Sequence, residues 1–111
     1  MLIVDDHAGF RAAARAFLED GGFEVVGEAA DGRSAIDAVR RLRPEILLLD
    51  VKLPDVDGFA VAAELADGAP QIVFTSSRGI TAYRRRLATN PAWSFVGKSD
   101  LTVESLAAAL A

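Results

Sequence analysis

Short apolar runs alternate with segments of helical spacing along this 111-residue chain, and this alternation restricts the fold more than any other feature of the sequence. Each run is short enough for a β-strand, and most of its residues are branched or aromatic. The runs are residues 2–4, 23–26, 46–49, 72–74 and 95–96. Helical spacing is clearest in residues 10–18, 36–42 and 103–110 and weaker in residues 59–65 and 81–87. The sequence therefore predicts five strands alternating with five helices.

Alternation of strands and helices implies right-handed crossovers and a parallel sheet with helices on both faces. Residues 46–49 are apolar at every position, which is typical of a strand buried on both sides. The length fits one domain spanning residues 1–111. We therefore expect a single α/β domain with a doubly wound, five-stranded parallel sheet and a functional site at the carboxyl ends of its strands.

The composition excludes several classes of function. Without cysteine the chain has no disulfide, thiolate zinc site or cysteine nucleophile. A membrane-spanning helix needs about 20 apolar residues in a row, and the sequence has no such run. The formal net charge of −4 argues against nonspecific binding to nucleic acid. We expect a cytoplasmic protein that contacts neither membrane nor nucleic acid directly.

Acidic residues follow two of the predicted strands. Asp5 and Asp6 come after the first strand, and Asp50 comes after the third. Single aspartates in such places are often caps or turn formers, but three carboxylates at one edge of a sheet repel one another and attract a cation. Oxygen ligands of this kind favour a hard ion such as Mg²⁺. The sequence therefore predicts a magnesium site at this edge.

Hydroxyl groups and a lysine follow the last two predicted strands. Thr75, Ser76 and Ser77 come after the fourth strand, and Lys98 follows the fifth. A hydroxyl and an ammonium group that face a carboxylate-bound Mg²⁺ form a site for a dianionic group, for which phosphoryl is the obvious candidate. The pattern thus indicates phosphoryl chemistry.

Taken together, these motifs resemble the receiver domain of two-component response regulators over essentially the whole chain. The resemblance is carried by Val4-Asp5-Asp6-His7, Leu49-Asp50-Val51-Lys52-Leu53-Pro54, Asp57-Gly58, the Ser76 region and Val96-Gly97-Lys98. It implies a flavodoxin-like fold with strand order 2-1-3-4-5. It also implies a signalling module that is not an enzyme beyond its own phosphorylation and dephosphorylation.

The resemblance implies a role for each site residue. Asp50 would be the phosphoacceptor, which takes its phosphoryl group from a sensor histidine kinase. Asp6, Asp50 and the backbone carbonyl of Lys52 would bind Mg²⁺, and Asp5 would assist through water. Lys98 would neutralise charge on the transferring group.

The resemblance also implies a switch formed by Ser76 and Phe95. The separations of Ser76 from Phe95 and Lys98 match those in similar family members, whereas Thr75 lies one residue too far away. Ser76 is therefore favoured over Thr75 as the switch hydroxyl. Phe95 would swing inward when Ser76 moves towards the phosphoryl group, although an ordinary core aromatic is the alternative for Phe95.

The expected partners follow from the same resemblance. Asp-Asp-His near the start and Ser99 in place of proline after Lys98 resemble the subgroup with a helix-turn-helix output domain, although we expect no such domain within residues 1–111. Besides the kinase, we expect a downstream protein to bind Thr81 to Leu87 and Leu101 to Leu110, and a homodimer is a further option.

Three other functions are alternatives to a phosphorylated receiver. A degenerate receiver would act as a scaffold without being phosphorylated. A metal-dependent phosphatase would need a second acid two residues after its nucleophile, but Asp50 is followed by Val51 and Lys52. A dinucleotide-binding module would need a glycine-rich turn where Asp5 and Asp6 stand. The segment between Asp50 and Ser76 is shorter than usual for a receiver, which predicts a trimmed third helix or following loop.

Overall fold

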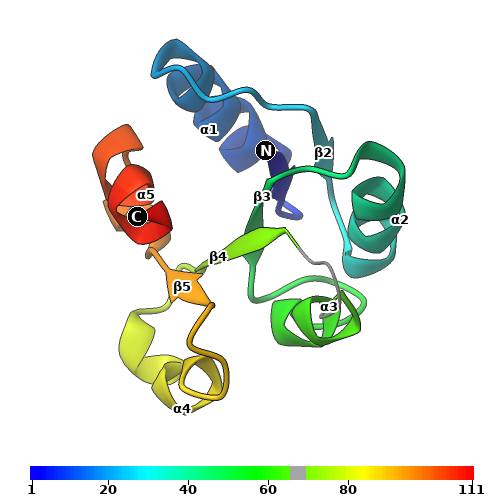
Figure 1. Ribbon diagram of the computed structural model, residues 1–111, viewed down its shortest axis with the longest axis vertical. Helices are drawn as coiled ribbons and strands as arrows, with labels where there is room; N and C mark the ends of the chain where they lie inside the picture. Colours follow the sequence, from blue (N-terminus) through cyan, green and yellow to red (C-terminus); the bar gives the residue numbers. More distant parts are fainter. Residues whose placement is uncertain (66–69) are drawn as a thin grey trace.

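The fold is an α/β sandwich around one parallel sheet, as seen in a computed structural model that describes residues 1–65 and 70–111 (Figure 1). The strands lie in the order β2-β1-β3-β4-β5, and every neighbouring pair is parallel. The strands are β1 (Leu2–Val4), β2 (Gly27–Ala29), β3 (Ile46–Asp50), β4 (Gln71–Thr75) and β5 (Ser94–Phe95). The predicted flavodoxin-like topology is confirmed.

Helices cover both faces of the sheet. Helices α1 (Ala8–Asp20) and α5 (Val103–Leu110) lie on one face, and α2 (Gly32–Leu42) and α3 (Gly58–Glu64) lie on the other (Figure 1). Neighbouring residues of the central strand show why both faces need cover. Leu47 and Leu49 pack in the cluster beneath α2 and α3, whereas Leu48 packs in the cluster beneath α1 and α5. A fully apolar run is thus a strand buried on both sides.

Local sequence signals fix the starts of three helices. The side chain of Asp31 accepts a hydrogen bond of 2.7 Å from the Ser34 backbone N–H at the start of α2. Asp57 plays the same part at the start of α3 by accepting from Ala60. A reciprocal capping box of Thr102 and Ser105 begins α5. Each cap satisfies amide groups that a helix end leaves without a partner.

The predicted second strand was wrong in position. Residues 23–26 do not form a strand, and β2 begins at Gly27. Gly27 pairs with Leu2, the first residue of β1, so the residues before it have only Met1 beside them. The Val26 N–H donates to the Met1 carbonyl at 2.8 Å, but Val26 itself stays 39% exposed. The apolar run packs at the end of the sheet without joining the ladder.

The predicted helix over residues 81–87 was also wrong in extent. A 3₁₀ turn, η1 (Ile80–Ala82), precedes a single turn of helix, α4 (Arg84–Leu87). Neither element contains a buried residue, and Ile80 is 46% exposed. Tyr83, between the two, is buried. A helix stabilised mainly by one buried side chain gains too little from packing to extend further.

The third predicted helix, residues 59–65, is confirmed within one residue at each end as α3. The predicted trimming after it falls on residues 66–69, which lie outside the described residues. The remaining strands differ from their predicted bounds by one residue at most. No helix in residues 1–65 and 70–111 is long and apolar enough to cross a membrane.

Candidate phosphoryl site

The predicted site residues lie at the carboxyl edge of the sheet. Asp5 directly follows β1, and Asp50 is the last residue of β3. Lys98 begins a 3₁₀ turn, η2 (Lys98–Asp100), shortly after β5. Because the strands are parallel, these positions meet at one edge although they are far apart in sequence. The fold thus brings the predicted acids and lysine together.

Lys98 is shared by two buried carboxylates. Its Nζ lies 2.6 Å from Asp5 Oδ2 and 3.3 Å from Asp50 Oδ2. The Asp5 and Asp50 side chains are 1% and 5% exposed, and that of Lys98 is 18% exposed. The ring of Phe10 on α1 covers the ammonium group, with its centroid 4.8 Å from Nζ. One ammonium between two carboxylates leaves an excess of one negative charge in a buried place.

Burial and the neighbouring charges shift the pKa values of two groups in this site. Burial raises the pKa of the Asp50 carboxyl, and the charge of Asp5 raises it further, against the opposing effect of Lys98. Burial lowers the pKa of Lys98, but its contacts with Asp5 and Asp50 outweigh burial and raise it overall. The surroundings of Asp50 therefore disfavour its charged form.

A cavity of about 310 Å³ opens beside Asp50. Its lining consists of two acids, two lysines, one histidine, one serine and two apolar residues: Asp6, His7, Asp50, Lys52, Leu53, Pro54, Ser77 and Lys98. Asp5 is not in the lining, so it contributes charge from beneath while Asp6 and Asp50 face the cavity. The cavity can hold a small anion next to Asp50.

The donor set fits a hard divalent cation. Ligand oxygens of Asp5 and Asp6 and a nitrogen of His7 lie within 4.8 Å of one another. Asp6 also shares the cavity with Asp50 and Lys52. Asp5 and Asp50 share the single ammonium group of Lys98, and Asp6 adds an exposed carboxylate. Such a set of acids suits a Mg²⁺ ion that keeps several waters. This group of close ligand atoms includes His7 and not Asp50, so the ligand set of Asp5, Asp6, Asp50 and the Lys52 carbonyl stays a prediction.

The turn after β3 is shaped around Asp50. The Gly58 N–H donates to the Val51 carbonyl at 2.7 Å, and Lys52 and Asp57 form an isolated antiparallel bridge. A Cβ atom on Gly58 would collide with the carbonyl oxygen of Asp50. This close approach explains the glycine of the predicted Asp57-Gly58 motif and holds α3 against the end of β3.

Ser76 lies beside the site, but its hydroxyl is engaged elsewhere. Ser76 is 3% exposed, and its Oγ lies 3.0 Å from the hydroxyl oxygen of Tyr83 and accepts a hydrogen bond of 3.0 Å from the Arg78 N–H. Ser77 is the residue of this segment that lines the Asp50 cavity. Thr75 Oγ1 is buried without a hydrogen-bond partner among the described residues. The role of Ser76 as switch therefore stays a prediction.

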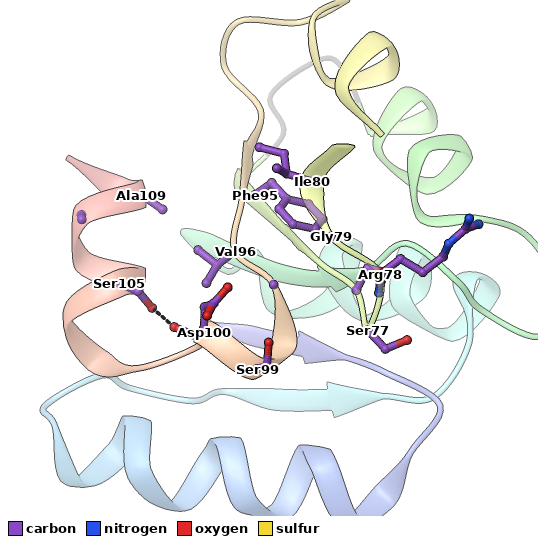
Figure 2. A pocket seen from close by; sticks show the side chains of 13 residues that line it. Ser77, Arg78, Gly79, Ile80, Phe95, Val96, Ser99, Asp100, Ser105 and Ala109 are labelled. Atoms are coloured by element: carbon purple, nitrogen blue, oxygen red, sulfur yellow. Dashed lines mark hydrogen bonds between the residues drawn. The ribbon is translucent and has the colours of Figure 1, made fainter. Parts of the chain in front are cut away.

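Phe95 and Ser76 line a second cavity, of about 530 Å³, between the loop after β4 and helix α5. Figure 2 shows the Phe95 ring beside Ile80 on one side of this cavity and Asp100 on another. Phe95 is half-buried, and its ring centroid lies 5.9 Å from that of Tyr83. The position is compatible with either a switch or a core aromatic.

Sequence reasoning missed two residues of this region. Phe10 begins the segment of helical spacing at residues 10–18, but its contact with Lys98 depends on how α1 meets the turn after β5. Tyr83 was not singled out, although it is the one tyrosine of the chain and lies in an otherwise arginine-rich segment. A single tyrosine among arginines was the sequence feature that could have drawn attention to Tyr83, but it does not identify the partner of the tyrosine hydroxyl.

The Asp50 pKa gives a testable pH dependence. Because this pKa is raised on folding, the folded state binds more protons than the unfolded state between the two pKa values, and stability falls as pH rises through that window. We expect Asp50→Asn to be more stable than the unmodified chain without divalent ions, by on the order of 1–2 kcal/mol at neutral pH. Urea unfolding from pH 4 to 7 should show the difference growing with pH. A difference that is constant with pH would contradict the assignment.

Comparison with known proteins agrees with this geometry. The model of the response regulator receiver domain family matches residues 1–111. A protein-glutamate methylesterase/protein-glutamine glutaminase of Alkalilimnicola ehrlichii is 38% identical over 78 residues, which are 68% of this chain and 20% of that protein. BvgA of Bordetella pertussis is 34% identical over 113 aligned residues, which cover 100% of this chain and 54% of that protein. The chain thus spans from a fifth to about half of these relatives.

Solved structures show the same similarity. A two-component response regulator of the LuxR family from Aurantimonas sp. SI85-9A1 superposes with a TM-score of 0.85 at 28% identity, over 98% of this chain and 82% of that one. A five-stranded parallel sheet with acids and a lysine at its carboxyl edge, together with these matches, shows that the chain belongs to the response regulator receiver domain family. This is a family of signalling modules.

Proposed function

We propose that this chain is a phosphoacceptor whose Asp50 takes a phosphoryl group from the phosphohistidine of a sensor histidine kinase in a Mg²⁺-dependent reaction. An Asp50 carboxylate oxygen attacks phosphorus, the bond from phosphorus to the histidine nitrogen breaks, and the imidazole leaves with the bonding electron pair. The product is an acyl phosphate on Asp50. The observation that carries the proposal is the shared ion pair of Lys98 with Asp5 and Asp50 next to an open cavity.

The metal would be held by Asp6, Asp50 and the backbone carbonyl of Lys52, with Asp5 acting through water. When bound, Mg²⁺ supplies positive charge to the oxygens of the transferring group. Lys98 lies against Asp50 and would supply a second positive charge. Asp5, buried beneath, keeps Lys98 charged and directed at the site. Most of the catalysis is therefore positioning and charge neutralisation.

The signal would leave the site through Ser76 and Phe95. A hydrogen bond to a charged group contributes about 1.5–3 kcal/mol, whereas shifting a two-state equilibrium from 1:99 to 99:1 needs about 5.5 kcal/mol. Ser76 alone therefore cannot switch the domain, and Lys98 and repacking around Phe95 must contribute. The downstream protein would bind the surface that these movements reach, on residues 81–87 and 101–110.

Intact mass spectrometry after incubation with Mg²⁺ and a small-molecule phosphodonor tests the proposal. The unmodified chain should gain the mass of one phosphoryl group, and Asp50→Asn should gain none because it lacks the nucleophilic oxygen. Asp37→Asn removes an exposed acid from α2 and should be phosphorylated normally. Removing Mg²⁺ with a chelator should stop the reaction.

The outcomes separate the alternatives. An unmodified chain that takes no phosphoryl group, but binds Mg²⁺, would support a degenerate receiver that acts as a scaffold. Steady release of product from a generic phosphate ester would support a phosphatase. Phosphorylation that persists in Asp50→Asn would place the acceptor elsewhere and contradict the proposal.

A further inference from the structure

The switch hydroxyl of Ser76 has a polar partner that the family resemblance does not supply. The resemblance pairs Ser76 with Phe95, which carries no polar atom. In the structure Ser76 Oγ lies 3.0 Å from the hydroxyl oxygen of Tyr83, and both residues are buried. Oγ also accepts a hydrogen bond from the Arg78 N–H. A serine hydroxyl has one hydrogen and two lone pairs, so these contacts use most of its hydrogen-bonding capacity.

The environment of Tyr83 holds its hydroxyl in place. Its ring centroid lies 6.0 Å from that of Phe59 on α3 and 5.9 Å from that of Phe95 on β5. One turn later, Arg86 pairs with Asp57 at 2.9 Å and lies over the Phe59 ring. The Tyr83 ring thus packs beside two other rings, and its hydroxyl cannot follow Ser76 without repacking them.

Ser76 and Asp50 line different cavities. Ser76 lines the cavity of about 530 Å³, with Phe95 and Ile80, whereas Asp50 and Lys98 line the cavity of about 310 Å³. The Lys98 N–H donates to the Ser76 carbonyl at 2.9 Å, so the backbone between them is fixed. A hydroxyl turned towards a phosphoryl group on Asp50 would therefore leave Tyr83.

We propose that Tyr83 is a positioning residue that holds the Ser76 hydroxyl in its resting orientation and competes for it with the phosphoryl group on Asp50. This inference rests on the proposed function. Phosphorylation breaks the contact between Ser76 and Tyr83 and frees the start of α4. The signal then has a second route to the surface, in addition to the one through Phe95. Because the contact exists only in the resting state, removing it favours the phosphorylated state.

Binding of beryllofluoride, a phosphoryl mimic, in the presence of Mg²⁺ tests this inference. The fluorescence of Trp93, whose ring lies 5.7 Å from Phe59, reports the change. Tyr83→Phe keeps the ring and removes the hydroxyl, and we expect it to bind beryllofluoride about 2- to 10-fold more tightly than the unmodified chain. Ser76→Ala loses the contact with the mimic and should bind about 10-fold more weakly or worse. Thr89→Val removes an exposed hydroxyl just after α4, outside both cavities, and should leave binding unchanged.

The double variant distinguishes competition from loosened packing. In the Ser76→Ala background, Tyr83→Phe should have no effect, because no serine hydroxyl is left to hold. A gain that persists there, or unchanged or weaker binding by Tyr83→Phe alone, overturns the inference. Failure of the unmodified chain to bind the mimic, or binding retained by Asp50→Asn, contradicts the proposed function and the inference together, so the two failures are distinguishable.

Discussion

Lys98→Ala is expected to lower the free energy of unfolding by about 3 kcal/mol in the absence of divalent ions, since it leaves Asp5 and Asp50 buried without their shared counter-charge. Part of the loss should be recovered as the pH falls and a carboxylate takes up a proton. Mg²⁺ should stabilise the variant at least as much as the unmodified chain, because the ion meets a more negative site. Urea unfolding at neutral pH, with a chelator and then with Mg²⁺, measures each effect.

Two further substitutions separate the charge of Lys98 from the packing of its stem. Lys98→Met keeps a long side chain beside Phe10 but removes the ammonium group, and it should be nearly as unstable as Lys98→Ala. Lys98→Arg keeps the charge and should recover most of the stability. A methionine variant as stable as the unmodified chain would show that the ion pair does not stabilise the fold.

With a phosphodonor, Lys98→Ala should bind metal but lose the change in Trp93 fluorescence. Equal fluorescence changes in Lys98→Ala and the unmodified chain would contradict the role of Lys98.

Gly58→Ala is expected to lower the free energy of unfolding by about 2 kcal/mol and to weaken Mg²⁺ binding. The added methyl group would meet the carbonyl oxygen of Asp50 and lie 3.1 Å from the Cα atom of Val51. Both are backbone atoms, which cannot rotate away as a flexible side chain can. Helix α3 and the end of β3 must therefore separate, and Asp50 moves with its strand.

A second glycine provides the matched control. Gly9 lies in α1, and a Cβ added there would meet no atom within 4 Å. Gly9→Ala should therefore leave Mg²⁺ binding unchanged and raise stability by about 0.5–1 kcal/mol, since alanine is the better helix former. Urea unfolding and Mg²⁺ titration of both variants test the assignment. Equal Mg²⁺ affinities in Gly58→Ala and Gly9→Ala would show that the contact with Asp50 does not shape the metal site.

The elements that sequence predicted well are those whose burial is decided within a few residues. The apolar run of β3 must be buried on both faces wherever it lies, and Asp57 and Thr102 cap helices that begin within one residue of their predicted starts. Helix α2 begins at Gly32, four residues before its predicted start, because the side chain of Asp31 caps it there. The bounds of β2 were wrong because a strand needs a partner, and the register of β1 excludes residues 23–26. The length of α4 was wrong because its stability depends on what packs against Tyr83.

The amino-acid sequence by itself determined the alternation of strands and helices, the parallel sheet and the edge at which the acids and the lysine meet. These features follow from burying apolar runs on both faces, which each run dictates locally. Tertiary structure alone decided that Lys98 serves both Asp5 and Asp50 and that the hydroxyl of Ser76 meets Tyr83. Such contacts join side chains from different elements, up to 93 residues apart for Asp5 and Lys98, at distances set by packing of the whole sheet.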